Sequence, residues 1–250
     1  MTSPSAPVRI ATAGWAIPRA VAQAFPAAGS GLERYAARFD AVEINSTFYR
    51  PHRPATYERW RQATPPGFRF AVKLPRAITH DARLVGAEAA LAAFAAEAAQ
   101  LQDKLGPLLV QLPPSLAFEP APHAAFFDAL RRAWPGPVAC EPRHPSWFEP
   151  APDALLRDHQ VARAAADPAR HPAAARPGGW PGLAYWRLHG SPRMYYSAYG
   201  EAFLSALAED LCANPARELW CVFDNTTSGA AAANALSLQE RLSLPPVART

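Results

Sequence analysis

The sequence predicts a (β/α)8 barrel, or TIM barrel, in one domain, and three observations support this fold class. Eight short apolar segments recur along the chain, most of them rich in β-branched or aromatic residues, as strands are. Alanine-rich, helix-like stretches separate most of them. The length of 250 residues is close to the usual size of such a barrel.

In chain order, the predicted strands are residues 9–15, 41–47, 68–75, 107–113, 138–144, 161–167, 184–190 and 218–225. The clearest helix follows the third strand, where Leu91, Phe94, Ala98, Leu101 and Leu105 form one apolar stripe. Lys104 is interpreted as lying in the last turn of this helix, closed by Gly106-Pro107.

One connection departs from the alternating pattern. Residues 168–183 are too rich in Pro and Gly for a good helix, so the sixth helical connection is predicted to be an irregular loop over the barrel mouth. No linker divides the chain. We expect residues 1–7 to form a flexible tail and residues 8–250 to form a single domain.

Composition limits the classes of protein to consider. The chain is 50% apolar and 18% charged, with no run long enough to span a bilayer and no signal-peptide pattern, which predicts a cytoplasmic protein and no membrane partner. The three cysteines lack metal-ligand spacing. Cys140 and Cys221 lie in predicted strands as free, buried thiols. The net charge of +4 slightly favours an anionic partner.

Strand parity predicts a charged interior. Side chains two residues apart share a face of a strand. In several of the predicted strands one face is entirely apolar and should pack under the helices, and the opposite, polar face should point into the barrel. The residues expected inside the barrel are Glu43, Lys73, Gln111, Glu141, Arg143, Arg187 and His189. Burying so many charges is costly unless they pair with one another or with a ligand. A self-satisfied ion network that only fills the barrel is the structural alternative to a functional site.

Several motifs together resemble the YecE-like family, domain of unknown function 72. They are ATAGW (11–15), VEINSTFYR (42–50), FAVKLPRAITH (70–80), KLGPLLVQLPPS (104–115), EPRHPSW (141–147), YWRLHG (185–190) and DNTTSGAAAANA (224–235). The resemblance covers almost the whole chain. It implies a TIM-barrel fold and brings no established reaction.

The sequence departs from the family pattern at two places. The family usually begins Gly-Thr-Ser-Gly-Trp, whereas Ala11 and Ala13 replace the first Gly and the Ser here. A role for that serine hydroxyl is therefore not carried over. The last strand of the family usually ends Phe-Asn-Asn, whereas Asp224 takes the place of the first Asn.

The charged residues suggest acid–base chemistry on a small anionic substrate. Glu43 and Glu141 are the candidate proton donor and acceptor, because carboxylates in different surroundings can have different pKa values. His144 and His189 are candidate proton carriers near neutral pH. Lys73 is either a Schiff-base amine or, as we favour, one of the cations that bind the anion.

Further residues are expected to bind the substrate, which is phosphorylated or sugar-like in this interpretation. The loops at 189–191 and 225–229 follow the last two strands, where barrels often bind phosphate. The predicted substrate-binding residues are Trp15, Asn45, Tyr49, Gln111, Arg143, Trp147, Arg187, Tyr195, Asp224 and Asn225. No cofactor is predicted, and the reaction class stays open between hydrolase, isomerase and lyase.

Three alternatives remain open at this stage. Glu43, Glu141, His144, His189 and Asp224 are suitable ligand types for a divalent metal, although the interleaved cations would already neutralise the acids. Rim aromatics beside arginines suggest a nucleic-acid-binding barrel, including a metal-dependent endonuclease or phosphodiesterase. The third alternative is a non-catalytic ligand-binding barrel.

Overall fold

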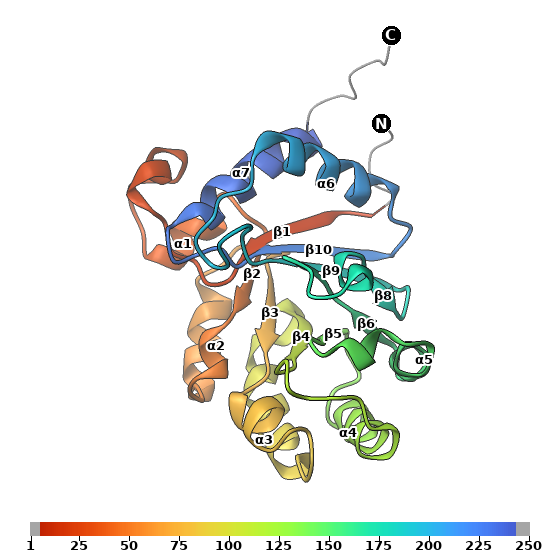
Figure 1. Cartoon of the computed structure of the whole chain (residues 1–250). Coiled ribbons are helices and arrows are strands. Elements are labelled where there is room, and N and C mark those ends of the chain that lie inside the picture. The colour runs from red at the N-terminus through yellow and green to blue at the C-terminus, as the bar shows by residue number, and fades with distance from the viewer. Residues whose placement is uncertain (1–5, 244–250) are drawn as a thin grey trace.

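The computed structural model describes residues 6–243. It has a mixed α/β single-domain fold in which helices surround parallel β-sheets (Figure 1). The α/β class is therefore confirmed. Residues 1–5 of the predicted tail, and residues 244–250, lie outside the described part of the chain.

The strands follow the predicted apolar segments closely. They are β1 (Val8–Thr12), β2 (Ala41–Ile44), β3 (Arg69–Lys73), β4 (Leu105–Gln111), β5 (Val138–Glu141), β6 (Val161–Arg163), β7 (Ala165–Asp167), β8 (Gly178–Gly179), β9 (Leu183–Leu188) and β10 (Glu218–Phe223).

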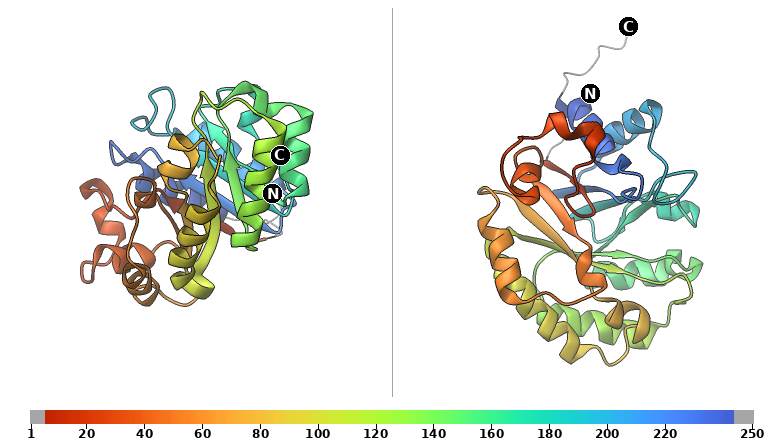
Figure 2. Two further views of the ribbon diagram at one scale, coloured as in Figure 1. Left: turned by 90° about the horizontal axis from the view of Figure 1, so that it is seen from below. Right: turned by 90° about the vertical axis from the view of Figure 1, so that its left-hand side faces the viewer.

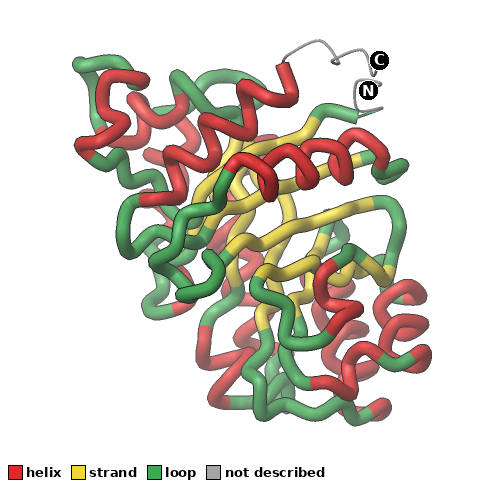
Figure 3. The backbone as a smooth tube through the Cα atoms, turned by 45° about the horizontal axis from the view of Figure 1, so that its top comes forward, coloured by secondary structure: helices red, strands yellow, loops and turns green. Residues whose placement is uncertain are grey.

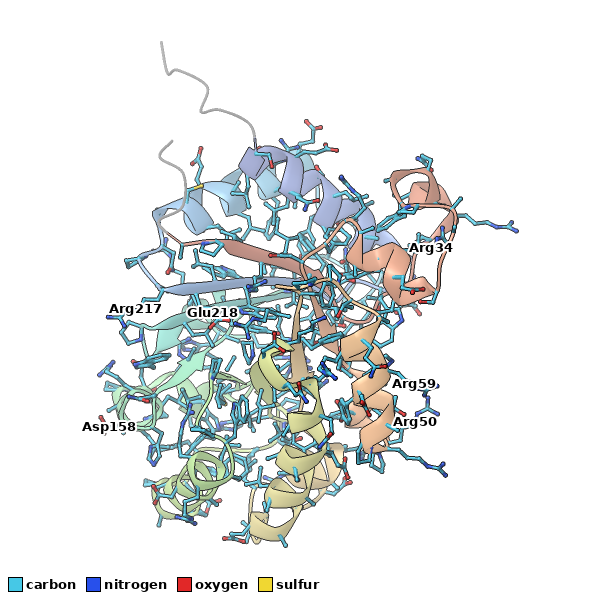
Figure 4. All side chains as sticks on the ribbon, turned by 180° about the vertical axis from the view of Figure 1, so that it is seen from behind. Arg34, Arg50, Arg59, Asp158, Arg217 and Glu218 are labelled. Carbon is cyan, nitrogen blue, oxygen red and sulfur yellow. The ribbon has the colours of Figure 1, made fainter. Side chains whose placement is uncertain are left out.

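The helices lie on the outside of the strands (Figures 2 and 3). The α-helices are α1 (Gly31–Ala36), α2 (Pro54–Gln62), α3 (Glu88–Ala98), α4 (Pro120–Ala133), α5 (Pro150–Asp158), α6 (Glu201–Ala213) and α7 (Ala230–Ser243). Several begin with Pro at the first helical positions, where its missing N–H costs no hydrogen bond. Exposed charges such as Arg59 and Arg217 project from the outer surface (Figure 4).

Two sheets carry the strands rather than one continuous eight-stranded sheet. The first has the order β1-β10-β9-β7 and the second the order β2-β3-β4-β5-β6-β8. All neighbouring pairs are parallel except β6 with β8. Parallel strands need crossover connections, which the outer helices supply.

The sheets meet at two places. A single bridge pairs Ala13, just after β1, with Glu43 of β2. At the other edge, the predicted sixth strand is divided at Ala164, because β6 pairs with β5 while β7 pairs with β9. One segment therefore takes part in both sheets.

The sixth connection is irregular, as predicted from its Pro and Gly content. It contains a 3-10 turn, η6 (Pro172–Ala175), and the two-residue strand β8. At Gly178 a Cβ atom would lie 2.2 Å from the guanidinium of Arg163. That neighbour is the movable end of a side chain; glycine is required at the next position, Gly179, where φ is +65° and a Cβ atom would lie 2.6 Å from the Val161 carbonyl oxygen.

The apolar residues form two cores. The main core lies between the sheets and the helices and includes the predicted stripe of the third connection, from Leu91 to Leu105. The second is formed by interior residues of the strands, namely Ala11, Ala41, Ala71, Leu109, Ala139, Ala162, Ala164, Leu183, Tyr185, Trp220 and Val222. The many alanines leave room for Tyr185 and Trp220, whose rings are stacked 6.1 Å apart.

The interpretation of Lys104 was wrong in one respect. α3 ends at Ala98 and continues as a 3-10 helix, and Gly106 lies inside β4 rather than closing a helix. The Lys104 ammonium instead donates to the carbonyls of Arg61 and Thr64 and to the Thr64 hydroxyl, at the end of α2. Lys104 is about 40 residues away from Arg61 and Thr64 in the sequence, so local sequence patterns could not predict this contact.

Candidate functional site

Arg187 lies at the centre of a buried network of charges. It belongs to β9, and none of its surface is exposed. Its Nε and Nη2 donate to Glu43 at 3.0 and 2.7 Å, Nη1 donates to Glu141 at 2.6 Å, and Nη2 also donates to Asp224 at 3.1 Å. A single guanidinium thus pairs with three carboxylates, which satisfies charges that would be very costly to bury alone.

The strand ends bring these residues together. Glu43 is in β2, Lys73 and Glu141 are the last residues of β3 and β5, and Asp224 follows β10 directly. Because the strands are parallel, their carboxyl ends meet on the same side of the molecule. The period of two then directs these side chains to the interior, above the alanine-rich second core.

Glu43 is held on both carboxylate oxygens. The Tyr185 hydroxyl donates to Oε2 at 2.9 Å, and Arg187 contacts both oxygens. Burial raises the pKa of Tyr185 well above its ordinary value, and the adjacent Glu43 charge raises it further. Tyr185 therefore keeps its proton and stays a hydrogen-bond donor. Both oxygens of Glu43 are bound by the Arg187 guanidinium, and Oε2 also accepts from the Tyr185 hydroxyl.

Glu141 stays ionised despite complete burial. Its Oε1 accepts from Arg143 Nε at 3.0 Å and contacts His189 Nε2 at 3.1 Å, while Oε2 accepts from Arg187. Burial alone would raise the pKa of Glu141, but the three cationic groups together lower it well below its ordinary value. Glu141 therefore binds cationic side chains as a carboxylate and is not suited to donate a proton.

His189 joins two of the carboxylates. Its Nδ1 lies 3.0 Å from Asp224 Oδ2 and its Nε2 lies 3.1 Å from Glu141 Oε1. Burial alone would lower its pKa, but Glu141 and the hydrogen bond to Asp224 outweigh that effect and raise it. Both ring nitrogens face acceptors, so the imidazolium form, with two donors, fits the geometry.

Lys73 is the exception in this network. It is 5% exposed, and within residues 6–243 its ammonium has no hydrogen bond or ion pair. Its contact is with the ring of Phe48, 4.0 Å from Nζ to the centroid. Burial, together with the charge of Arg187, lowers the pKa of Lys73 to about 8, although the nearby carboxylates act in the opposite direction.

His80 was missed by the sequence reasoning. It lies in a single π-helical turn, η3 (Ala77–Asp81), and its ring contacts Phe48 at a centroid distance of 4.9 Å. Burial and the charge of Lys73 lower the pKa of His80. Its place in the sequence offered no signal, because a π-turn has no characteristic pattern, although such turns are frequent at functional sites.

A pocket reaches the network from outside. It is a shallow cleft with a cavity volume of about 10 Å³, room for about one water molecule. Its lining residues are Glu141, Pro142, Arg143, Ala166, Pro168, Arg170, Ala174, His189 and Met194. Tyr195 lies beside it, with its ring edge-on to His189 at 5.8 Å. The pocket thus adds the exposed cation Arg170 to the cations of the network.

Two amide residues lie at the same strand ends. Gln111, the last residue of β4, is buried and pairs in register with Glu141. Asn45 follows β2, and its Oδ1 is buried with no hydrogen-bond partner in the described part of the chain. Neither side chain is used by the carboxylate network.

Other predicted site residues lie elsewhere. His144 accepts a hydrogen bond from the Ser146 amide and caps the 3-10 turn η5 (Pro145–Phe148). Trp147 is fully buried, donates to the Leu116 carbonyl and packs against Phe118. The structure therefore gives both residues contacts that are separate from the Arg187 network.

The remaining predicted residues lie around the edge. Trp15 is half-buried and packs edge-on against Trp60 at 5.2 Å. Tyr49 is 76% exposed. Asn225 is buried and donates to the Ser197 carbonyl, so it holds a loop.

Among residues 6–243, no three His, Cys, Asp or Glu side chains are arranged to hold a metal ion. The geometry explains this for the predicted ligands. The oxygens of Glu43 and Glu141 accept hydrogen bonds from arginines, and His189 uses both nitrogens on carboxylates.

The sequence matches the family described as "Protein of unknown function DUF72" over residues 9–249. The chain belongs to the DUF72 family. It is also 34% identical to the UPF0759 protein YecE of Escherichia coli, in strains K12 and O157:H7, over 122 residues. That match covers 48% of this chain and 43% of YecE, so less than half of the curated relative is spanned.

Solved structures of DUF72 proteins share the fold. A protein from Thermotoga maritima has a TM-score of 0.78 at 26% identity, with 95% of this chain and 99% of that chain covered. A protein from Enterococcus faecalis has a TM-score of 0.78 at 22% identity, covering 96% and 97%. No helix described in residues 6–243 has both the length and the apolarity of a membrane-spanning segment.

Proposed function

We propose that this DUF72 protein is an enzyme that binds a small anionic substrate beside Lys73 and acts on it by acid–base chemistry. The observation that carries the proposal is the buried ammonium of Lys73, which has no acidic partner within the described residues. The three carboxylates are already paired with Arg187, Arg143 and His189. Lys73 is therefore a positive charge left for a ligand.

In this proposal the charged residues divide into two groups. Glu43, Glu141 and Asp224 form a frame around Arg187, because their oxygens are occupied by strong donors. Lys73, with a pKa of about 8, and His189, whose pKa Glu141 and the hydrogen bond to Asp224 raise above its ordinary value, are the proposed proton carriers. Proton transfer by the glutamates, which strand position first suggested, would require the Arg187 contacts to break.

We also infer that the two sheets act as one (β/α)8 barrel with this site at its mouth. The Ala13–Glu43 bridge, with a 2.8 Å bond from the Gly14 amide to the Glu43 carbonyl, supports closure on one side. The shared segment of β6 and β7 supports it on the other. Chemistry at the carboxyl ends of strands is typical of this architecture.

Thermal unfolding with added anions tests the proposed function. Inorganic phosphate and small sugar phosphates should raise the Tm of the wild-type protein, because a ligand that binds only the native state stabilises it. The shift should disappear in Lys73→Met and persist in Arg59→Met, which changes an exposed arginine. Equal shifts in all three proteins would contradict the proposal. Binding without turnover of any compound would favour a non-catalytic binding protein.

A second candidate function is binding of single-stranded nucleic acid. Tyr49 and Tyr196 are exposed, and the guanidinium of Arg193 lies 4.0 Å from the Tyr196 ring centroid. Aromatic rings beside arginines suit stacked bases and phosphates. This candidate predicts binding to a DNA oligonucleotide that weakens steeply with salt and is reduced in Tyr49→Ala.

A further inference from the structure

The chain contains two lysines, and their ammonium groups differ in hydrogen bonding. Lys104 is 8% exposed, and its ammonium donates three hydrogen bonds, to the carbonyls of Arg61 and Thr64 and to the Thr64 hydroxyl. Lys73 is 5% exposed and, within the described residues, has no acceptor at all. An ammonium is normally buried only with its donors satisfied. The Nζ atom of Lys73 is not among the fully buried atoms that lack a partner, so this ammonium, unlike that of Lys104, is held by no protein acceptor of the described residues and keeps contact with solvent.

We propose that Lys73 forms an imine with a carbonyl group of the substrate, which identifies the substrate class as small anionic aldehydes or ketones. The inference rests on the proposed anion site and specifies its chemistry. A buried amine without hydrogen-bonded acceptors keeps its nitrogen lone pair accessible once the proton leaves. An amine held by three acceptors, such as Lys104, does not.

The step balances without any further reactant. One ammonium proton passes to a neighbouring base, for which the neutral imidazole of His80, on the same Phe48 ring, is suitable. The Nζ lone pair then attacks the carbonyl carbon, and the carbonyl electron pair moves to oxygen. Two protons that started on the ammonium leave with this oxygen as water. The products are a protonated imine and water, and water reverses the reaction.

The surroundings favour both the amine and the imine. Burial and the Arg187 charge hold the pKa of Lys73 at about 8, so at pH 7 the unprotonated fraction is about two hundredfold larger than for an ordinary lysine. The charge remains positive when the ammonium becomes an iminium ion. The Phe48 ring, 4.0 Å from Nζ, therefore stabilises the adduct as it does the free residue.

Reductive trapping with glyoxylate tests the inference. Glyoxylate is the smallest aldehyde that carries a carboxylate, so its size does not exclude it from the site. The 250-residue chain is incubated with glyoxylate and sodium cyanoborohydride at pH 7, and the labelled positions are identified by peptide mass spectrometry. We expect Lys73 to be labelled at least roughly tenfold faster than Lys104, whose ammonium is held by three acceptors.

Two matched variants and one anion complete the test. Lys73→Arg keeps the charge but cannot form an imine, so the label should disappear. Lys104→Arg should keep it. Inorganic phosphate should slow the labelling of Lys73, because it competes for the same site, whereas labelling by uncharged acetaldehyde should be much slower.

The outcomes separate the two proposals. If phosphate raises the Tm in a manner that depends on Lys73 but glyoxylate leaves Lys73 unlabelled, the imine is excluded and the anion site stands. If neither effect occurs, both proposals fail. Equal labelling of Lys73 and Lys104 would also overturn the inference, because it would show ordinary amine reactivity.

Discussion

At the scale of single residues, Arg187 determines whether the interior of this protein can carry charge. Its five N–H donors match carboxylates in three directions, which a lysine could not do. Glu43 and Glu141 are completely buried, and Asp224 is nearly so. Each therefore depends on the same guanidinium.

Replacing Arg187 should strongly destabilise the fold. Arg187→Met leaves buried carboxylates without their main partner, so the free energy of unfolding at pH 7 should fall by about 3–5 kcal/mol. Urea denaturation measures this change. Arg59→Met, at an exposed position, should change it by less than about 0.5 kcal/mol. A loss of similar size in both variants would contradict the assigned role of Arg187.

Replacing Lys73 should have the opposite effect. Lys73→Met removes an ammonium that has no ion pair within the described residues and keeps most of the apolar volume, so we expect stabilisation by about 1–3 kcal/mol at pH 7. The folded pKa of about 8 is below the unfolded value, so wild-type stability rises as pH increases from 8 towards 10.5. The advantage of the variant should therefore shrink over that range.

Lys104 offers the control for this prediction. Lys104→Met deletes three hydrogen bonds to buried or half-buried acceptors and should destabilise the protein. Urea denaturation at pH 7 and pH 10 compares the three proteins. If Lys73→Met is as unstable as Lys104→Met, the Lys73 ammonium has a stabilising partner in solution. If Lys73 lowers the stability of the fold, its presence is best explained by a functional role.

At the scale of elements, the loop between β9 and α6 is fastened by α7. Asn234 of α7 accepts from the Tyr199 amide through Oδ1 and donates to the Tyr199 carbonyl through Nδ2. Asn225 donates to Asn234 and to the Ser197 carbonyl. At Gly190, φ is +93° and a Cβ would lie 2.7 Å from the Ser197 carbonyl, so glycine is needed where the loop begins. The loop that carries Tyr195 is thus held by two amide side chains.

Removing the Asn234 side chain should loosen this loop selectively. Asn234→Ala leaves backbone groups of Tyr199 without partners, which should cost about 1–3 kcal/mol. Hydrogen–deuterium exchange should show faster exchange in residues 190–200 and little change in α3. Ala233→Ser, at an exposed position of the same helix, is the control. Uniformly faster exchange would indicate global destabilisation instead.

Also at this scale, the elements differ in how well the sequence predicted them. Strands were predictable because a short apolar run and alternating polarity are local signals. The division of the sixth strand at Ala164 was not, because it depends on which neighbours β6 and β7 meet in space. His144 illustrates the same limit for the site, since its capping bond to Ser146 is local but cannot be distinguished by residue type from a catalytic position.

At the scale of the whole molecule, a network of buried charges lies at the strand ends of a largely apolar domain. The alanine-rich interior lies beneath the network, and the main core lies between the sheets and the helices. The stability of the entire domain is therefore linked to the protonation of a few central groups.

The protein should lose stability on acidification because of these groups. The cations around Asp224 lower its pKa against the effect of burial, and the same is true of Glu141. A lowered folded pKa contributes stability above the unfolded value of about 4, which is lost as pH falls through the folded value. Thermal unfolding between pH 7 and pH 3 should give a falling Tm.

Asp224→Asn tests the origin of that slope. The variant lacks one titrating group of the network, so its Tm should fall less steeply with decreasing pH than that of the wild type, from a lower starting value at pH 7. Glu58→Gln, which changes an exposed carboxylate, should keep the wild-type slope. Parallel curves for the wild type and Asp224→Asn would show that acid unfolding originates elsewhere.

The sequence by itself determined the α/β class, the order of the strands and the faces on which Glu43, Lys73 and Glu141 lie. These properties follow from hydrophobic period and chain order, which are local. Only the tertiary structure decided that Arg187 pairs with Glu43, 144 residues away, and that within residues 6–243 Lys73 forms no ion pair. The reason is physical: pairing among buried charges depends on the register of distant strands and on distances of a few ångströms, and neither is encoded in any one segment.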